Sequence, residues 1–163
     1  MRYAQIRRYD VANGTGIRTT IFFSGCTHNC PSCFNKEYQS FRYGSEYTKE
    51  TEELLLEYLK DPNVKGLSVL GGEPLQQDPS KLLSLFKRVK GEIGKDIWVW
   101  TGYTLEEIPK QYSECLELID ILVDGRFVPE LKSAMLQFRG SKNQRVIDVQ
   151  STLKLNQVIS HLE

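Results

Sequence analysis

Short apolar strands alternate with amphipathic helical segments along most of this chain. The strand signals are β-branched and aromatic runs at 19–23, 66–70, 97–100 and 119–123, each followed by glycine or polar residues. A strand, a loop and a helix thus recur about every 30 residues, which is the length of a βα unit. This order predicts an α/β fold with a mostly parallel sheet, in which ligands gather at the carboxyl ends of the strands.

Three helices are expected between these strands. An apolar stripe of period 3.6 predicts the first over 51–60. Asp78 is expected to cap the second, with Pro79 in its first turn. The third is expected to run from the capping-box sequence Thr104–Glu107 to about Leu118.

Length limits how far this pattern can extend. A full barrel of eight βα units needs about 250 residues, whereas this chain has 163. We therefore expect a shortened, partial (βα) barrel that forms a single domain over 1–163. The pattern weakens after Arg126, and the tail from about 146 is compatible with a strand, a helix or a docking arm.

The charge balance and the hydropathy of the chain limit the kinds of binding partner and the cellular location that we expect. Lys and Arg together number 21, as do Asp and Glu, so no whole-chain field attracts nucleic acid or a membrane surface. No apolar stretch approaches the roughly 18 residues of a membrane helix, and the start Met1–Arg8 lacks the apolar core of a signal peptide. We expect a cytoplasmic protein, in which clustered thiols stay reduced and bind metal or react.

Three of the four cysteines lie within eight positions, on the loop after the first predicted strand: Cys26, Cys30 and Cys33. Chance placement of unremarkable thiols is one interpretation. A zinc site is a second, with His28 or Cys115 as fourth ligand, although structural zinc usually uses two separated pairs. The third is a [4Fe–4S] cluster that holds three thiolates and leaves one iron open, whereas such clusters normally take four. Cys115 lies in a predicted helix, where a buried structural thiol is the default.

The spacing C-x₃-C-x₂-C is the signature of the radical S-adenosylmethionine (SAM) superfamily, which this sequence resembles. Ser32 replaces the aromatic or large apolar residue that usually precedes the third cysteine there. That departure suits one branch, the activating proteins of anaerobic (class III) ribonucleoside-triphosphate reductases. Further segments resemble the same branch, in the same order: Asp10–Arg18, Ser24–Cys26, Cys33–Asn35, Lys95–Tyr103, Val123–Gly125 and Arg139–Arg145.

The resemblance implies the fold of a partial radical SAM barrel and a set of cofactor-binding residues. In that family Cys26, Cys30 and Cys33 would hold the [4Fe–4S] cluster, whose open iron chelates the amino and carboxylate groups of SAM. Thr101 and Asp124 are also candidates for a monovalent cation site near SAM. The expected SAM-binding residues are Ser32, Cys33, Phe34, Gly71, Gly72, Glu73, Thr101, Asp124 and Asn143.

Several of these residues also have simple structural interpretations. The glycine pair could serve a tight βα turn, Asp124 could start a turn, and Asn143 could cap one. Trp98 and Trp100 lie on one face of a strand, which favours core packing over cofactor contact.

The implied function is reductive cleavage of SAM, followed by hydrogen abstraction from a glycine of the large subunit of the anaerobic ribonucleotide reductase. A flavodoxin or ferredoxin would supply the electron. Since no general acid or base is needed, His28 is expected beside the cluster or facing solvent. The alternatives are an activase of the pyruvate formate-lyase type, a radical SAM enzyme acting on a small molecule, and a non-catalytic zinc-binding adaptor.

Overall fold

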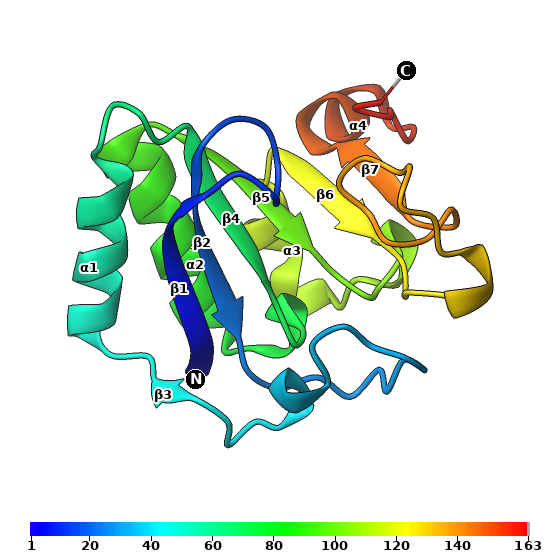
Figure 1. The fold of residues 1–163 in the computed structure, drawn as a ribbon. Helices are drawn as coiled ribbons and strands as arrows, with labels where there is room; N and C mark the ends of the chain where they lie inside the picture. The colour runs from blue at the N-terminus through cyan, green and yellow to red at the C-terminus, as the bar shows by residue number, and fades with distance from the viewer. Residues whose placement is uncertain (163) are drawn as a thin grey trace.

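A computed structural model describes residues 1–162, and the seven strands of this part of the chain form one mixed sheet in the order β3-β1-β2-β4-β5-β6-β7 (Figure 1). Their bounds are β1 (Arg2–Asp10), β2 (Arg18–Phe23), β3 (Ser45–Glu46), β4 (Gly66–Gly71), β5 (Asp96–Trp100), β6 (Ile121–Asp124) and β7 (Arg145–Asp148). The α/β prediction is confirmed.

The expectation of a mostly parallel sheet is wrong outside its centre. β2, β4, β5 and β6 pair in parallel, whereas β1, β3 and β7 pair antiparallel. Parallel neighbours need a crossover of a dozen or more residues. The loop at 11–17 between β1 and β2 is too short for one, and the segment between β6 and β7 returns without an α-helix.

The α-helices in this part of the chain are α1 (Lys49–Leu59), α2 (Pro79–Arg88), α3 (Ser113–Leu116) and α4 (Val149–Leu155). Single 3₁₀ turns cover Lys36–Gln39, Pro74–Gln76, Leu105–Glu107, Lys110–Tyr112 and Pro129–Leu131, and a π-turn covers Val89–Ile93. α2 begins as predicted, because the Asp78 side chain accepts hydrogen bonds from the amides of Ser80 and Lys81. None of these helices combines the length and the apolarity that crossing a bilayer requires.

The predicted helix from Thr104 to Leu118 is wrong. The capping box between Thr104 and Glu107 forms, but it closes only one 3₁₀ turn. Ile108 leaves the helical region, with ψ at 124°, because Pro109 disfavours the α conformation in the residue before it. A second 3₁₀ turn follows at Lys110–Tyr112, and an α-helix forms only at Ser113–Leu116.

Two strands of the sheet, β1 and β7, lie where the sequence pattern carries no clear strand signal. β1 forms from side chains that are mostly half-buried or exposed, so its apolar pattern is weak. The uncertain tail contributes β7, which pairs with β6, and then α4, which Asp148 caps.

Side chains alternate across the two faces of the sheet. One face packs against α1, α2 and α3, which Figure 1 shows together on one side, and forms the main core. Its members include Ile21, Phe23, Leu55, Leu59, Leu67, Val69, Leu82, Phe86, Ile97, Val99 and Leu122. The opposite face carries a smaller cluster of Trp98, Ile121, Val123 and Val146. The candidate site opens on this second face.

Candidate functional site

A cavity of about 690 Å³ lies at the carboxyl ends of the parallel strands. The loops after β2, β4, β5 and β6 line it, as the topology of a parallel sheet predicts. Arg7, Ala12 and Asn13 also border it, and the irregular segment 127–144 supplies a further wall through Phe127, Lys132, Ser133, Ala134, Leu136, Phe138, Arg139, Gly140 and Gln144.

The thiols of Cys26, Cys30 and Cys33 all line this cavity, and each of these residues is half-buried and free of disulfides. Their loop is tightly wound, since Asn29 and Ser32 both adopt positive φ, at 53° and 57°. This conformation lets the chain reverse twice between the cysteines and turn the three thiols toward one space.

The environment of these thiols disfavours free thiolates. Burial raises the pKa of Cys26 to about 11, and the charges of Glu73, Cys30 and Cys33 add to the increase. Burial also raises the pKa of Cys30. Because the thiolate is the form that binds metal, a cationic centre in the cavity would relieve this repulsion and would release protons as it binds.

In the part of the chain that the structure describes, the donor set offers three thiols around one cavity but no fourth ligand for a single metal ion. Among residues 1–162, no three His, Cys, Asp or Glu side chains converge on a single point that would suit one ion. The thiolates of an iron–sulfur cluster bind separate iron atoms, so they need only surround a common space. Both fourth ligands considered for zinc are engaged elsewhere: Cys115 is buried with its Sγ 3.8 Å from the carbonyl of Pro79, and the Nε2 of His28 contacts Glu73.

The turn after β4 is fastened to the cysteine loop by its backbone. The amide of Gly72 donates to the carbonyl of Phe23 at 3.0 Å, and that of Glu73 donates to the carbonyl of Gly25 at 2.8 Å. A Cβ at Gly72 would lie 2.6 Å from the carbonyl oxygens of Gly25 and Tyr38. Only glycine permits this approach, and the same two segments border the cavity.

The carboxylate of Glu73 is fully buried and accepts four hydrogen bonds. Its Oε1 accepts from the Nε2 of His28 at 2.7 Å and from the amide of Gly102 at 2.7 Å. Its Oε2 accepts from the Oγ1 of Thr101 at 2.8 Å and from the amide of Leu75 at 2.9 Å. The side chain of His28, which belongs to the cysteine loop, is only 5% exposed and therefore does not face solvent.

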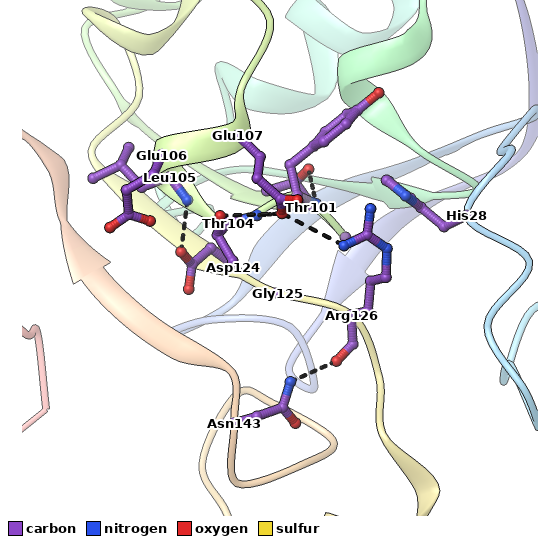
Figure 2. A network of polar contacts seen from close by, with 12 residues as sticks. His28, Thr101, Thr104, Leu105, Glu106, Glu107, Asp124, Gly125, Arg126 and Asn143 are labelled. Carbon is purple, nitrogen blue, oxygen red and sulfur yellow. Dashed lines mark hydrogen bonds and ion pairs between the residues drawn. The ribbon is translucent and has the colours of Figure 1, made fainter.

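Asp124 and Asn143 lie outside the cavity lining. Figure 2 shows the carboxylate of Asp124 turned toward the amide of Leu105, from which it accepts at 2.8 Å. Arg145 pairs with the same carboxylate, so the Asp124 side chain is engaged by a cationic group of the protein itself. Asn143 donates to the carbonyl of Arg126 at 2.8 Å and thereby supports the wall from outside.

The structure therefore brings most, but not all, of the expected residues to one space. The side chain of Ser32 does not line the cavity either, while Phe34 does and packs against Phe127 with ring centroids 4.7 Å apart. The expected residues that border the cavity are Cys26, Cys30, Cys33, Phe34, Gly71, Gly72, Glu73 and Thr101.

Comparisons with known proteins agree with this geometry. The sequence model of the family described as "4Fe-4S single cluster domain" matches residues 12–147. The chain is 45% identical over 150 residues to the "Anaerobic ribonucleoside-triphosphate reductase-activating protein" of Salmonella typhimurium, which covers 90% of this chain and 97% of that one. The Escherichia coli K12 protein of the same name is 44% identical with the same coverage. The one from Enterobacteria phage T4 is 38% identical over 148 residues, 90% of this chain and 93% of the phage protein.

The chain belongs to the family of anaerobic ribonucleoside-triphosphate reductase-activating proteins. The resemblance drawn from the sequence is thereby confirmed, and the iron–sulfur domain model covers all three clustered cysteines.

Two residues of this family member line the cavity without having been predicted to do so. Trp100, for which core packing was favoured over cofactor contact, borders the cavity and donates from Nε1 to the carbonyl of Phe138 at 2.6 Å. Lys132 lies over the ring of Phe34 at 5.5 Å. Neither contact has a local sequence signal, because each depends on how segment 127–144 folds back over the sheet.

The segment Arg139–Arg145 turns out to brace that wall. The Oε1 of Gln144 accepts from the amides of Gly140 and Ser141, and Arg139 donates to the carbonyl of Gln144 at 2.8 Å. Its polar residues thus hold a turn together.

Proposed function

We propose that this chain is a radical SAM activase that generates a glycyl radical on the large subunit of the anaerobic ribonucleotide reductase. The observation that carries the proposal is the convergence of three half-buried free thiols on one cavity at the carboxyl ends of parallel strands. The family name supports the reductase as the protein acted on. The four parallel strands around this cavity agree with a partial radical SAM barrel.

In this proposal Cys26, Cys30 and Cys33 hold a [4Fe–4S] cluster and leave one iron open. When bound, the cluster and SAM would supply reductive cleavage of a carbon–sulfur bond and removal of a hydrogen atom from the target glycine. A flavodoxin or ferredoxin would deliver the electron, and the cytoplasm would keep the thiols reduced.

The chain itself would bind, orient and exclude water. The Gly71–Gly72 backbone would border SAM, because both glycines line the cavity while the Cβ that each lacks would meet the neighbouring backbone. The rings of Phe34 and Phe127, which pack together at the mouth, would shield the reacting atoms from solvent. Asp124 and Asn143 would act from behind the wall, through Leu105 and Arg126.

The test is anaerobic reconstitution with iron and sulfide, followed by dithionite-driven cleavage of SAM. A brown protein with about four irons per chain that releases 5′-deoxyadenosine supports the proposal, provided that Cys30→Ala abolishes both properties. The buried thiol offers the matched control, so Cys115→Ala should keep the cluster. A colourless protein that binds zinc and leaves SAM intact would favour the adaptor instead.

The target is tested separately by electron paramagnetic resonance. We expect a glycyl radical signal when the anaerobic reductase is added and none when pyruvate formate-lyase is added. The opposite result would assign the chain to the other kind of glycyl radical activase.

A further inference from the structure

The buried carboxylate of Glu73 has no acceptor position left for a ligand. A carboxylate offers about four lone-pair sites, and here His28, Thr101, Gly102 and Leu75 fill them. The side chain is fully buried at the border of the cavity, and all four of its hydrogen-bond donors belong to the protein. It is therefore not available to bind an amino group of a cofactor.

The donors come from segments that are far apart in the sequence. His28 lies within the cysteine loop, between Cys26 and Cys30, whereas Thr101 and Gly102 follow β5. Glu73 itself follows β4. One carboxylate thus links the loop that carries the thiols to the ends of two strands that border the cavity.

The ring of His28 is also held by shape. A Cβ at Gly102 would lie 2.6 Å from its Cδ2, so only glycine leaves room for the ring at this place. Tyr103 packs edge-on against it, with ring centroids 4.6 Å apart. A hydrogen bond and two steric contacts therefore fix the orientation of a side chain in the middle of the cysteine loop.

We propose that Glu73 and His28 form a positioning pair that sets the place of the cysteine loop, and hence of the cluster, relative to the cofactor pocket. The inference rests on the proposed function, because it assigns the cluster to this loop. It departs from the expectation that Glu73 touches SAM. Glu73 acts through His28 and is a positioning residue, not a catalytic one.

The variants that test the pair follow from which atoms of Glu73 and His28 donate and accept hydrogen bonds. Glu73→Gln replaces one acceptor oxygen by a donor, so in either orientation of the amide one backbone amide, that of Gly102 or Leu75, faces another donor. His28→Ala removes the link but leaves the other three donors in place. His28→Gln keeps an N–H near the position of Nε2. His161→Ala is the matched control, since His161 is exposed and packs edge-on against Trp98, away from the cysteines.

The experiment measures the cluster without SAM, in anaerobically reconstituted full-length protein. The readouts are the rate of cluster loss to an iron chelator, the midpoint potential and the paramagnetic resonance spectrum of the reduced cluster. We expect His28→Ala and Glu73→Gln each to speed cluster loss by about 10-fold, the size typical for partners that orient metal ligands, and to shift the spectrum. His28→Gln should recover most of the wild-type rate, and the double variant should be no worse than the faster single variant.

Two results would overturn the pair. One is a Glu73→Gln protein whose SAM-free cluster behaves as wild type while its KM for SAM rises, because that is the behaviour of a cofactor ligand. The other is a His28→Ala protein that matches His161→Ala. If Glu73→Gln does not fold, the comparison of His28→Ala with His28→Gln decides. Failure of the proposed function would show in the wild type, as a protein that assembles no cluster, whereas failure of the pair shows only in the variants.

Discussion

Arg145 and Asp124 form an ion pair across the antiparallel junction of β6 and β7, with Nε 3.1 Å from Oδ1. The Asp124 side chain is only 1% exposed, while that of Arg145 is 38% exposed and also contacts Glu106. The pair therefore has a buried end and a solvated end. It fastens the last strand of the sheet to the strand whose loop borders the cavity.

Replacing Asp124 should affect stability more than cofactor binding. Asp124→Ala leaves the amide of Leu105 without its acceptor and should lower the free energy of unfolding by about 2 kcal/mol. Glu106→Gln, at the solvated end of the same network, should change it by less than about 1 kcal/mol. Urea unfolding of the apo protein measures both. An Asp124→Ala protein of wild-type stability with weakened SAM binding would instead make this residue a cofactor ligand.

The glycines of the β4 turn should differ sharply from a glycine in open space. Gly72→Ala places a Cβ against two carbonyl oxygens that cannot yield without moving the cysteine loop, so it should cost about 1–3 kcal/mol. Gly91→Ala meets no atom within 4 Å and should be neutral or slightly stabilising. Thermal unfolding and the iron content of the reconstituted protein would be measured for both variants, Gly72→Ala and Gly91→Ala. Equal effects at the two positions would contradict the packing described for the turn.

Local signals explain why some of this molecule could be predicted from its sequence. β4 was expected at 66–70 and lies at Gly66–Gly71, because an apolar run bounded by glycines defines a buried strand at short range. The helix predicted at 51–60 begins only two residues earlier, at Lys49. The Thr104 helix failed where Pro109 breaks it, since a capping box signals a start but not a length.

Some residues of the candidate site could likewise be predicted from the sequence, and others could not. The cysteines and the glycine pair could be found from the sequence. The spacing of the cysteines indicates a cluster site, and the missing side chains of the glycines indicate a close approach of the backbone. The placement of Asp124 and Asn143 could not, because the direction of a side chain at the end of a strand depends on neighbours such as Arg145 and Arg126. The partnership of His28 with Glu73 joins residues 45 positions apart and leaves no trace in either local sequence.

The apo protein should lose stability in alkali through its buried thiols. Burial raises the pKa of Cys26 from 9.0 to about 11, so the folded chain holds this proton more tightly than the unfolded chain does. The resulting stabilisation is complete below about pH 9 and is lost as the pH rises toward about 11. Cys26→Ala should flatten this part of the pH profile of the melting temperature. Superimposable alkaline profiles for wild type and variant would contradict the assignment.

The wall formed by segment 127–144 should be held in place by Trp100. Its Nε1 donates to the carbonyl of Phe138, so Trp100→Phe removes this anchor while keeping an aromatic ring at the position. We expect faster amide hydrogen exchange within 127–144, with a loss of global stability of only about 1 kcal/mol.

Trp98→Phe is the control for Trp100→Phe. Trp98 lies on the same face of the sheet, but it is only 2% exposed and packs in the smaller hydrophobic cluster. Its truncation should lower the protection of β5, β6 and β7 together, with a larger global loss of about 2 kcal/mol. Unchanged exchange within 127–144 in the Trp100→Phe protein would show that the other hydrogen bonds of the wall, among them those of Gln144, Arg139 and Asn143, are enough to hold it.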